Sequence, residues 1–295
     1  MTDGVLLIAH GTVESLDELP AFVAKIRHGR PPPPGLLDEL RRRYALIGRS
    51  PLLEVTRAQA AALEARLGVP VLVGMRLWRP FVEDVLVEAA ERGLTRLAAV
   101  PLAPYSAAVY AAAAERALAS AAARLDGRRV ELRCAAPWGV EPALVGAHAA
   151  LIRAALGGDD DVALVMTAHS LPSAAIRAGD RYEAEVRASA AAVGALVDRP
   201  FRLAFQSQGA DGGEWLGPGL RDALEAARAA GARRAVVAPI GFLADHVETL
   251  YDLDVEARDW ARALGLELAR VPALGAHPGL VEALARVAER TLAGR

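Results

Sequence analysis

Two short segments, LLIAHG at residues 6–11 and VMTAHS at residues 165–170, decide the fold class of this 295-residue chain. Each is an apolar run that ends in Ala-His followed by a small residue. Short apolar runs are typical of strands that are buried on both faces of a parallel sheet. Their recurrence in the second half of the chain predicts two similar units.

Two further matches support this repeat. An Arg-Gly or Ala-Gly pair leads into AVPL at residues 99–102 and into VAPI at residues 237–240. VEL at residues 130–132 likewise corresponds to LEL at residues 266–268. Chance similarity between alanine-rich segments is the alternative explanation. We predict eight strands, four in each half, at residues 5–9, 69–74, 97–100, 130–133, 162–167, 201–206, 235–238 and 266–270.

Helical stretches rich in Ala, Leu, Arg and Glu alternate with these strands, which predicts an α/β fold with helices covering parallel sheets. We expect two Rossmann-like domains, residues 1–150 and 151–295, each with a four-stranded parallel sheet. The last helix is expected to pack back on the first domain. The boundary falls near residues 148–161, where GGDDD at residues 157–161 predicts a loop.

Composition excludes several classes of protein. The 34 basic and 36 acidic residues give a net charge of −2, which argues against nucleic acid as a main partner. The single cysteine, Cys134, excludes an internal disulfide and an iron–sulfur cluster. No apolar run approaches the ~20 residues of a membrane span. These features predict a cytoplasmic protein, and they leave peripheral contact with a membrane open.

Histidines end the first strand of each half, and ligands of open parallel sheets bind at the carboxyl ends of the strands. His10 and His169 both occupy such a position. A hydrogen-bonded histidine of the core is the structural alternative for His169. The default binding site is a cleft between the two halves.

A second candidate region is GFLADHVETLYDLDVE at residues 241–256. If Asp245 caps a helix, Glu248, Asp252 and Glu256 lie four residues apart on one face. A solvated helix face is the alternative, but the apolar residues between the carboxylates favour burial. Buried carboxylates need a cation or protons, so the row predicts a path for a divalent metal such as Fe(II) or Zn(II).

A third region surrounds four successive prolines at residues 31–34, which exclude regular structure there. Arg27, Arg30, Arg43 and Arg49 lie on either side of the prolines. Arginine binds carboxylates through paired hydrogen bonds, so these residues are candidate contacts for an acidic ligand. Solvated arginines in an arginine-rich protein are the alternative.

Taken together, these segments resemble the ferrochelatase family, most closely the short bacterial type that inserts iron into coproporphyrin III. The resemblance spans nearly the whole chain. It rests on GT at residues 11–12, IRHGRP at 26–31, RYALIG at 43–48 with SPL at 50–52, AHSLP at 168–172 with GD at 179–180 and Tyr182, QS at 206–207, WLGP at 215–218, and GF at 241–242 with DHVETLY at 245–251.

This resemblance implies the chelatase fold, in which two flavodoxin-like domains enclose a porphyrin cleft. His169 and Glu248 match the pair that binds the metal and accepts protons, and Asp252 and Glu256 match a carboxylate row on the metal's entry path. Fe(II) is then a substrate, no cofactor or iron–sulfur cluster is required, and a downstream enzyme of the haem pathway is a further partner. The positions that match porphyrin contacts are His10, Arg27, Arg43, Tyr44 and Ser50.

Three departures from the family pattern affect the preference for coproporphyrin III over protoporphyrin IX. His10 stands where the coproporphyrin type has a tyrosine that ligates the product iron, and we hypothesise that His10 takes over this role. The segment at residues 103–106 is one residue short and lacks a histidine. Gly139 follows Trp138 at a place where an aromatic residue often helps to hold the porphyrin.

Two other functions stay open from the sequence. Ala9–Thr12 also resembles cobalt and nickel chelatases that act on sirohydrochlorin-like tetrapyrroles, which typically lack the pattern of residues 27–50 and 215–218. A haem-binding protein without catalysis is the other alternative. The presence of both His169 and Glu248 argues against it.

Overall fold

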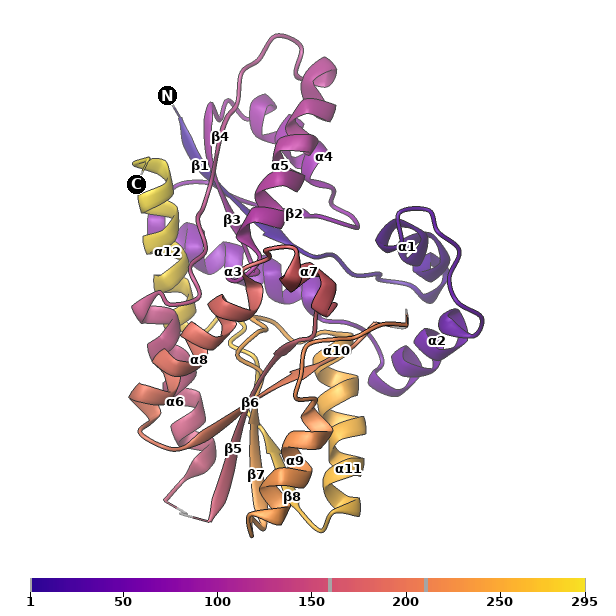
Figure 1. The fold of residues 1–295 in the computed structure, drawn as a ribbon. Coiled ribbons are helices and arrows are strands. Elements are labelled where there is room, and N and C mark those ends of the chain that lie inside the picture. Colours follow the sequence, from indigo (N-terminus) through magenta and orange to yellow (C-terminus); the bar gives the residue numbers. More distant parts are fainter. Residues whose placement is uncertain (1, 159–160, 210–211, 295) are drawn as a thin grey trace. The chain divides into compact units, whose positions relative to one another are not determined.

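The computed structural model describes residues 2–158, 161–209 and 212–294 (Figure 1). By their contacts the residues form two units, one made of residues 1–32, 51–143 and 275–295 and the other of residues 33–50 and 144–274. Of the loop predicted at residues 157–161, residues 159 and 160 lie outside the described part of the chain.

Each unit contains one four-stranded parallel sheet, and the two sheets have the same topology. In the first unit the order is β2-β1-β3-β4, and in the second it is β6-β5-β7-β8. This repetition confirms the predicted fold class. All eight strands overlap their predicted ranges: β1 (Asp3–Ala9), β2 (Val71–Met75), β3 (Arg96–Pro101), β4 (Glu131–Cys134), β5 (Val162–His169), β6 (Phe201–Gln206), β7 (Arg234–Ala238) and β8 (Glu267–Arg270).

The helices of the first unit cover its sheet on both faces. Side chains of α4 and α5 share an apolar cluster with Leu6, Ile8 and Leu97 of the sheet. The last helix, α12, packs against α3 and β3. The helices are α1 (Leu19–Ile26), α3 (Leu52–Leu67), α4 (Val82–Glu91), α5 (Ala107–Ala121) and α12 (Pro278–Leu292), with short 3₁₀ turns η1 (Leu16–Glu18) and η2 (Ala122–Leu125).

The second unit has two apolar clusters because its central strand is buried on both faces. Leu164 and Met166 of β5 join a cluster with α6 and α8, whereas Val165 joins a cluster with α9 and α11. This alternation follows from the two-residue period of a strand. The helices are α2 (Leu36–Ile47), α6 (Pro142–Leu156), α7 (Ser173–Arg177), α8 (Tyr182–Val197), α9 (Leu220–Ala229), α10 (Val247–Tyr251) and α11 (Ala257–Ala263), with the π-helical turn η3 (Asp252–Glu256) between the last two.

Two segments lie on the other side of a simple division at residues 150 and 151, and the second of them is the last helix, which was expected to pack on the first domain. Residues 33–50 belong with the second unit, because α2 contacts α10. Residues 275–295 belong with the first unit, because α12 packs on α3 and β3. The limit between the units, at residues 143 and 144, falls inside the continuous helix α6.

Candidate active site

His169 is the last residue of β5, at the carboxyl end of the second sheet. Its ring is held by a hydrogen bond from Nδ1 to the carbonyl oxygen of Ser170. The hydroxyl of Tyr182 donates to the carbonyl oxygen of His169 at 2.8 Å. These two bonds fix both the backbone and the ring, and they leave Nε2 for a partner outside the strand.

The segment that supplies this partner reaches the end of β5 through a close backbone approach at Gly241. The Gly241 N–H donates to the carbonyl oxygen of Thr167 at 3.0 Å. A Cβ at residue 241 would lie only 2.7 Å from the Cα of Ala168, so glycine is required here for space. The close approach brings the start of α10 beside His169.

His169 and Glu248 form the predicted pair, with 3.5 Å between Nε2 and Oε2. Each side chain is about one third exposed, His169 by 33% and Glu248 by 34%. Burial lowers the pKa of His169, but the charge of Glu248 and the hydrogen bond to it outweigh burial and raise that pKa from 6.5 to about 9. Burial raises the pKa of Glu248, but the charge of His169 and hydrogen bonds hold it well below 4.5.

His246 is a third member of this cluster that the sequence reasoning missed. Its Nε2 lies 3.4 Å from Oε2 of Glu248, and its ring lies 5.0 Å from that of Phe242. Within the described residues its buried Nδ1 has no hydrogen-bond partner. The sequence could have indicated His246, because it lies two residues before Glu248 and directly before the helix that contains this carboxylate.

Asp252 lies one helical turn after Glu248 and has partners from two other elements. Arg43 Nη1 on α2 lies 3.0 Å from Asp252 Oδ1, and the hydroxyl of Ser207 donates to Oδ2. Burial and the negative charge of Glu248 raise the pKa of Asp252 from 3.8 to about 6, against the lowering effects of Ser207 and Arg43. Ser207, which follows β6 with a φ of 61°, was also missed.

The structure corrects two details of the predicted carboxylate row. Asp245 is not the helix cap, because α10 begins after His246 and Asp245 instead pairs with Arg270 and accepts from the Thr249 hydroxyl. The row is not one α-helical face either. A π-helical turn begins at Asp252, and its extra residue shifts Glu256 from the position that a regular helix would give it.

A cavity of about 300 Å³ lies beside this turn. Its lining combines both signs of charge with a hydroxyl and an aromatic ring, from Arg43, Ser207, Arg221, Asp252, Glu256 and Trp260. Asp252 and Glu256 therefore line the same cavity, and their role on a metal path stays a prediction.

The predicted porphyrin contacts of the second unit lie in and after α2. Arg43 is engaged by Glu39 at 2.8 Å and Asp252 at 3.0 Å, and its guanidinium lies 4.4 Å from the ring centre of Tyr251. Tyr44 is buried, and the buried hydroxyl of Ser50 has no partner among the described residues. Contacts of these side chains with a porphyrin stay predictions.

The other predicted contacts, His10 and Arg27, belong to the first unit. His10 is exposed after β1, and its carbonyl oxygen accepts from the Leu77 N–H at 2.9 Å. The Nε of Arg27 donates to the carbonyl oxygen of Pro31 at 3.1 Å, which folds the loop before the prolines back on the end of α1.

The structure explains how the first unit accommodates Gly139. The ring of Tyr105 occupies the space that a side chain at residue 139 would need, since a Cβ there would lie 2.2 Å from the ring. Tyr105 lies in the segment that is one residue short. The Tyr105 ring and the missing side chain at residue 139 therefore fit each other in the packing of this unit.

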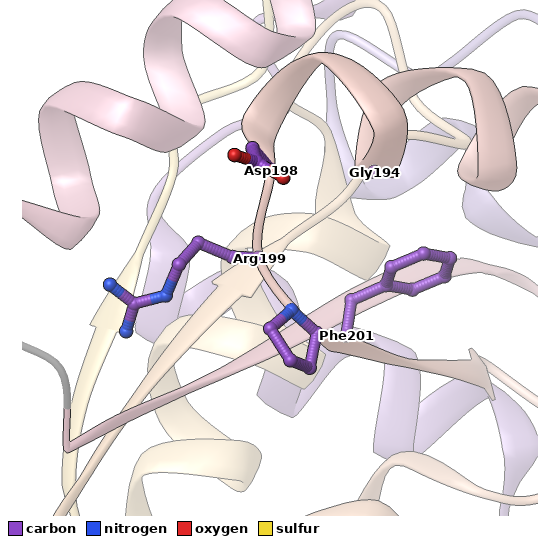
Figure 2. A pocket seen from close by; sticks show the side chains of 5 residues that line it. Gly194, Asp198, Arg199 and Phe201 are labelled. Atoms are coloured by element: carbon purple, nitrogen blue, oxygen red, sulfur yellow. The ribbon is translucent and has the colours of Figure 1, made fainter.

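A second hollow lies far from these residues along the strands of the second sheet. The shallow hollow in Figure 2 is lined by Gly194, Asp198, Arg199, Pro200 and Phe201, at the start of β6 and thus at the opposite end of the sheet.

The described residues contain no group of three or more His, Cys, Asp or Glu side chains arranged to hold a metal ion. Within the same residues, no helix has the length and apolar character to cross a membrane.

Comparison with known proteins gives matches to one family over nearly the whole chain. The family model described as Ferrochelatase matches residues 2–292. A ferrochelatase of Acidobacterium capsulatum is 37% identical over 98% of this chain and 94% of its own length. A ferrochelatase of Deinococcus radiodurans is 36% identical over 98% and 96%. A coproporphyrin III ferrochelatase of Frankia alni is 36% identical over 97% of this chain and 79% of its own length.

Solved structures support the fold. SirB from Bacillus subtilis with Fe³⁺ aligns with a TM-score of 0.64 at 16% identity, over 100% of this chain and 97% of that one. CbiX, described as the terminal enzyme for biosynthesis of sirohaem in denitrifying bacteria, aligns with a TM-score of 0.58 at 17% identity, over 98% and 99%. These neighbours confirm the chelatase fold.

Proposed function

The chain belongs to the ferrochelatase family, metal-inserting enzymes of haem biosynthesis, and on this premise we propose that it inserts Fe(II) into a carboxylate-bearing porphyrin. Coproporphyrin III is the favoured substrate and protoporphyrin IX the second choice. Relatives named coproporphyrin III ferrochelatase support this choice at 36% and 31% identity. The observation that carries the proposal is the His169–Glu248 pair at the carboxyl end of the second sheet.

The proposed reaction exchanges one cation for two protons. Fe(II) binds the four pyrrole nitrogens, two N–H bonds break, and two protons leave. With its pKa far below neutral, Glu248 is a carboxylate that can accept a proton at pH 7. His169, with a pKa of about 9, is protonated at pH 7, so it can accept a proton only after releasing its own. An arriving cation favours that release, because positive charge lowers the pKa of an imidazole beside it.

The carboxylates beyond this pair give Fe(II) a route toward it. Asp252, with a pKa of about 6, is mostly ionised at pH 7, and it shares a cavity with Glu256. Oxygen donors suit a hydrated divalent cation, and the nitrogen of His169 suits Fe(II). Arg43 offsets part of the negative charge, which keeps Asp252 from binding the cation too tightly to release it.

Arginines and hydroxyls are proposed to bind the carboxylates at the rim of the porphyrin. Arg27 and Arg43 supply charge, Tyr44 and Ser50 supply hydroxyls, and His10 is proposed to ligate the product iron. We also infer a cytoplasmic location and transfer of the product to a downstream enzyme of the haem pathway. These inferences rest on the family resemblance.

An anaerobic assay tests the function. The purified chain is mixed with Fe(II) and either coproporphyrin III or protoporphyrin IX, and loss of the free-base absorption is followed. We expect metallation of both porphyrins, faster with coproporphyrin III, and little with sirohydrochlorin and Co(II). A chain that binds haem but consumes no free-base porphyrin would support the non-catalytic alternative instead.

A matched pair of histidine variants ties the activity to the site. His169→Ala should abolish insertion while porphyrin binding, read by fluorescence quenching, stays intact. His277→Ala is the control, because His277 caps α12 in the first unit. Full activity in His169→Ala would contradict the assignment.

A further inference from the structure

Arg270, the last residue of β8, forms ion pairs with Asp245 and Asp254, on either side of Glu248 and Asp252 in the sequence. Its side chain is only 12% exposed. Nε and Nη2 each lie 2.9 Å from a carboxylate oxygen of Asp254, and Nη1 lies 2.8 Å from Oδ1 of Asp245. One guanidinium therefore binds two carboxylates, one of them with two parallel bonds.

These two carboxylates lie on either side of the residues that carry the chemistry. Asp245 comes just before the start of α10, and Asp254 lies in the middle of the π-helical turn η3. Glu248 and Asp252 lie between them in sequence. The Thr249 hydroxyl also donates to Asp245 Oδ1 at 2.9 Å, which joins the first turn of α10 to the same group. Arg270 thus connects the beginning and the end of the segment at residues 245–256, here called the carboxylate segment.

The π-helical turn between Asp245 and the end of the segment is an uncommon local conformation. Hydrogen bonds from residue i to i+5 are rare, and they appear mostly as single turns inside α-helices. If the turn relaxed to a regular α-helix, the residues after it would rotate, and Asp254 would leave the fork of Arg270. The planar guanidinium, with five fixed donors, matches two oxygens of Asp254 and one of Asp245 together, which a lysine ammonium cannot do.

We propose that Arg270 is a positioning residue for metal insertion, which fixes the register of the carboxylate segment and so holds Glu248 beside His169 and Asp252 beside Ser207. Among the described residues Arg270 forms no hydrogen bond or ion pair with His169 or Glu248, so it acts through Asp245 and Asp254. The kinetic part of this inference rests on the proposed function, whereas the structural part does not.

The structural part is tested by hydrogen exchange in the full chain. In Arg270→Met, amides of residues 245–256 should exchange at least about tenfold faster, as expected when an opening costs roughly 1.4 kcal/mol less, while amides of β5 and β6 keep their rates. Arg234→Met is the matched control. Arg234 is the first residue of the neighbouring strand β7, 27% exposed, and it bonds to the carbonyl oxygens of Ala155 and Leu156 and to Glu267.

The kinetic part is tested with the same variants. Because a misplacement of about 1 Å in a catalytic group can cost about a hundredfold in rate, Arg270→Met should lower kcat about ten- to a hundredfold with an unchanged KM for the porphyrin. Arg270→Lys should keep an intermediate kcat. Arg234→Met should lower Tm without changing kcat at a temperature where it is folded.

Three results would overturn the inference. They are wild-type exchange rates at residues 245–256 in Arg270→Met, a wild-type kcat in that variant, and equal losses of kcat in Arg270→Met and Arg234→Met. If Arg270→Met does not fold, Asp254→Asn tests the same contact from the other side. If the wild-type chain inserts no metal, the proposed function is wrong. The exchange experiment would still decide whether Arg270 holds the carboxylate segment in place.

Discussion

The carboxyl ends of β1 and β5 are equivalent places in two sheets of the same topology, yet they differ in chemistry. Each strand lies between two parallel neighbours. β5 ends in Ala168-His169, whereas β1 ends at Ala9 and His10 is the next residue. His169 meets Glu248 at 3.5 Å, whereas His10 is exposed beside Gly11, whose backbone packs against Trp78. A shared scaffold therefore does not imply a shared reaction, because the chemistry resides in the residues placed on it.

The difference originates in the segment after the third strand of each half. In the first half, β3 leads to α5, whose first turn contains no acidic residue. In the second half, β7 leads to α10, whose first turn contains Glu248. The corresponding helix supplies Tyr110 to the core in one unit and a carboxylate to an imidazole in the other. The helix after the third strand of the second half thus supplies the carboxylate that pairs with His169.

The comparison predicts its largest effect when the two histidines are replaced in turn. His169→Ala should lower kcat for iron insertion by about 10² to 10⁴-fold, the usual contribution of a positioned acid or base. His10→Ala should leave kcat nearly unchanged, because His10 is proposed to ligate the product iron and not to accept the protons that leave the porphyrin. Single-turnover kinetics with coproporphyrin III measures both variants.

His10 has a separate, spectroscopic readout. If it ligates the product iron, His10→Ala should alter the absorption spectrum of the bound product, and His10→Tyr should shift it toward a phenolate form. Identical product spectra in the wild type and His10→Ala would show that His10 is not a ligand. A large loss of kcat in His10→Ala would contradict the claim that His169 of the second half, and not His10 of the first, takes part in metal insertion.

Gly241→Ala should have a smaller but still clear effect on activity. The new methyl would press on the Cα of Ala168, next to His169, so the variant should lose about 1–3 kcal/mol of stability and about tenfold or more in kcat. Thermal unfolding and steady-state kinetics check the two effects. Stability lost with kcat retained would mean that the close approach matters only for packing.

Gly139→Ala should show the smallest effect, confined to stability. The Tyr105 ring fills the space at residue 139, so the added methyl should destabilise the fold by about 1–3 kcal/mol. Gly146→Ala is the control, because a Cβ at this α6 position meets nothing within 4 Å and should stabilise the helix by about 0.5–1 kcal/mol. Equal Tm values for the two variants would refute the packing account of residue 139.

The sequence predicted what depends on local pattern. Apolar runs placed all eight strands, and the position of His169 after one of them, together with the family resemblance, predicted its pairing with Glu248. The sequence did not predict the features of the site that depend on tertiary contacts. Aspartate is a common helix cap, so the sequence predicted this role for Asp245. In the structure Asp245 pairs with Arg270 of β8 instead, and His246 is the residue at the cap position. The π-helical turn has no local signature of its own, so four-residue spacing predicted a regular helix for Asp252 and Glu256.

The most direct test of the central claim is the pKa of His169, followed by NMR titration of its ring protons in the wild type and in Glu248→Gln. The carboxylate of Glu248 should raise this pKa from 6.5 to about 9. Because the folded-state pKa of His169 lies above its unfolded value, the pair contributes its full stability below about pH 6.5, as long as Glu248 is ionised, and loses it as the pH rises through about 9. Glu248→Gln removes the negative charge, so the pKa of His169 should fall. A wild-type His169 that titrates at or below 6.5, or one unaffected by Glu248→Gln, would contradict the account.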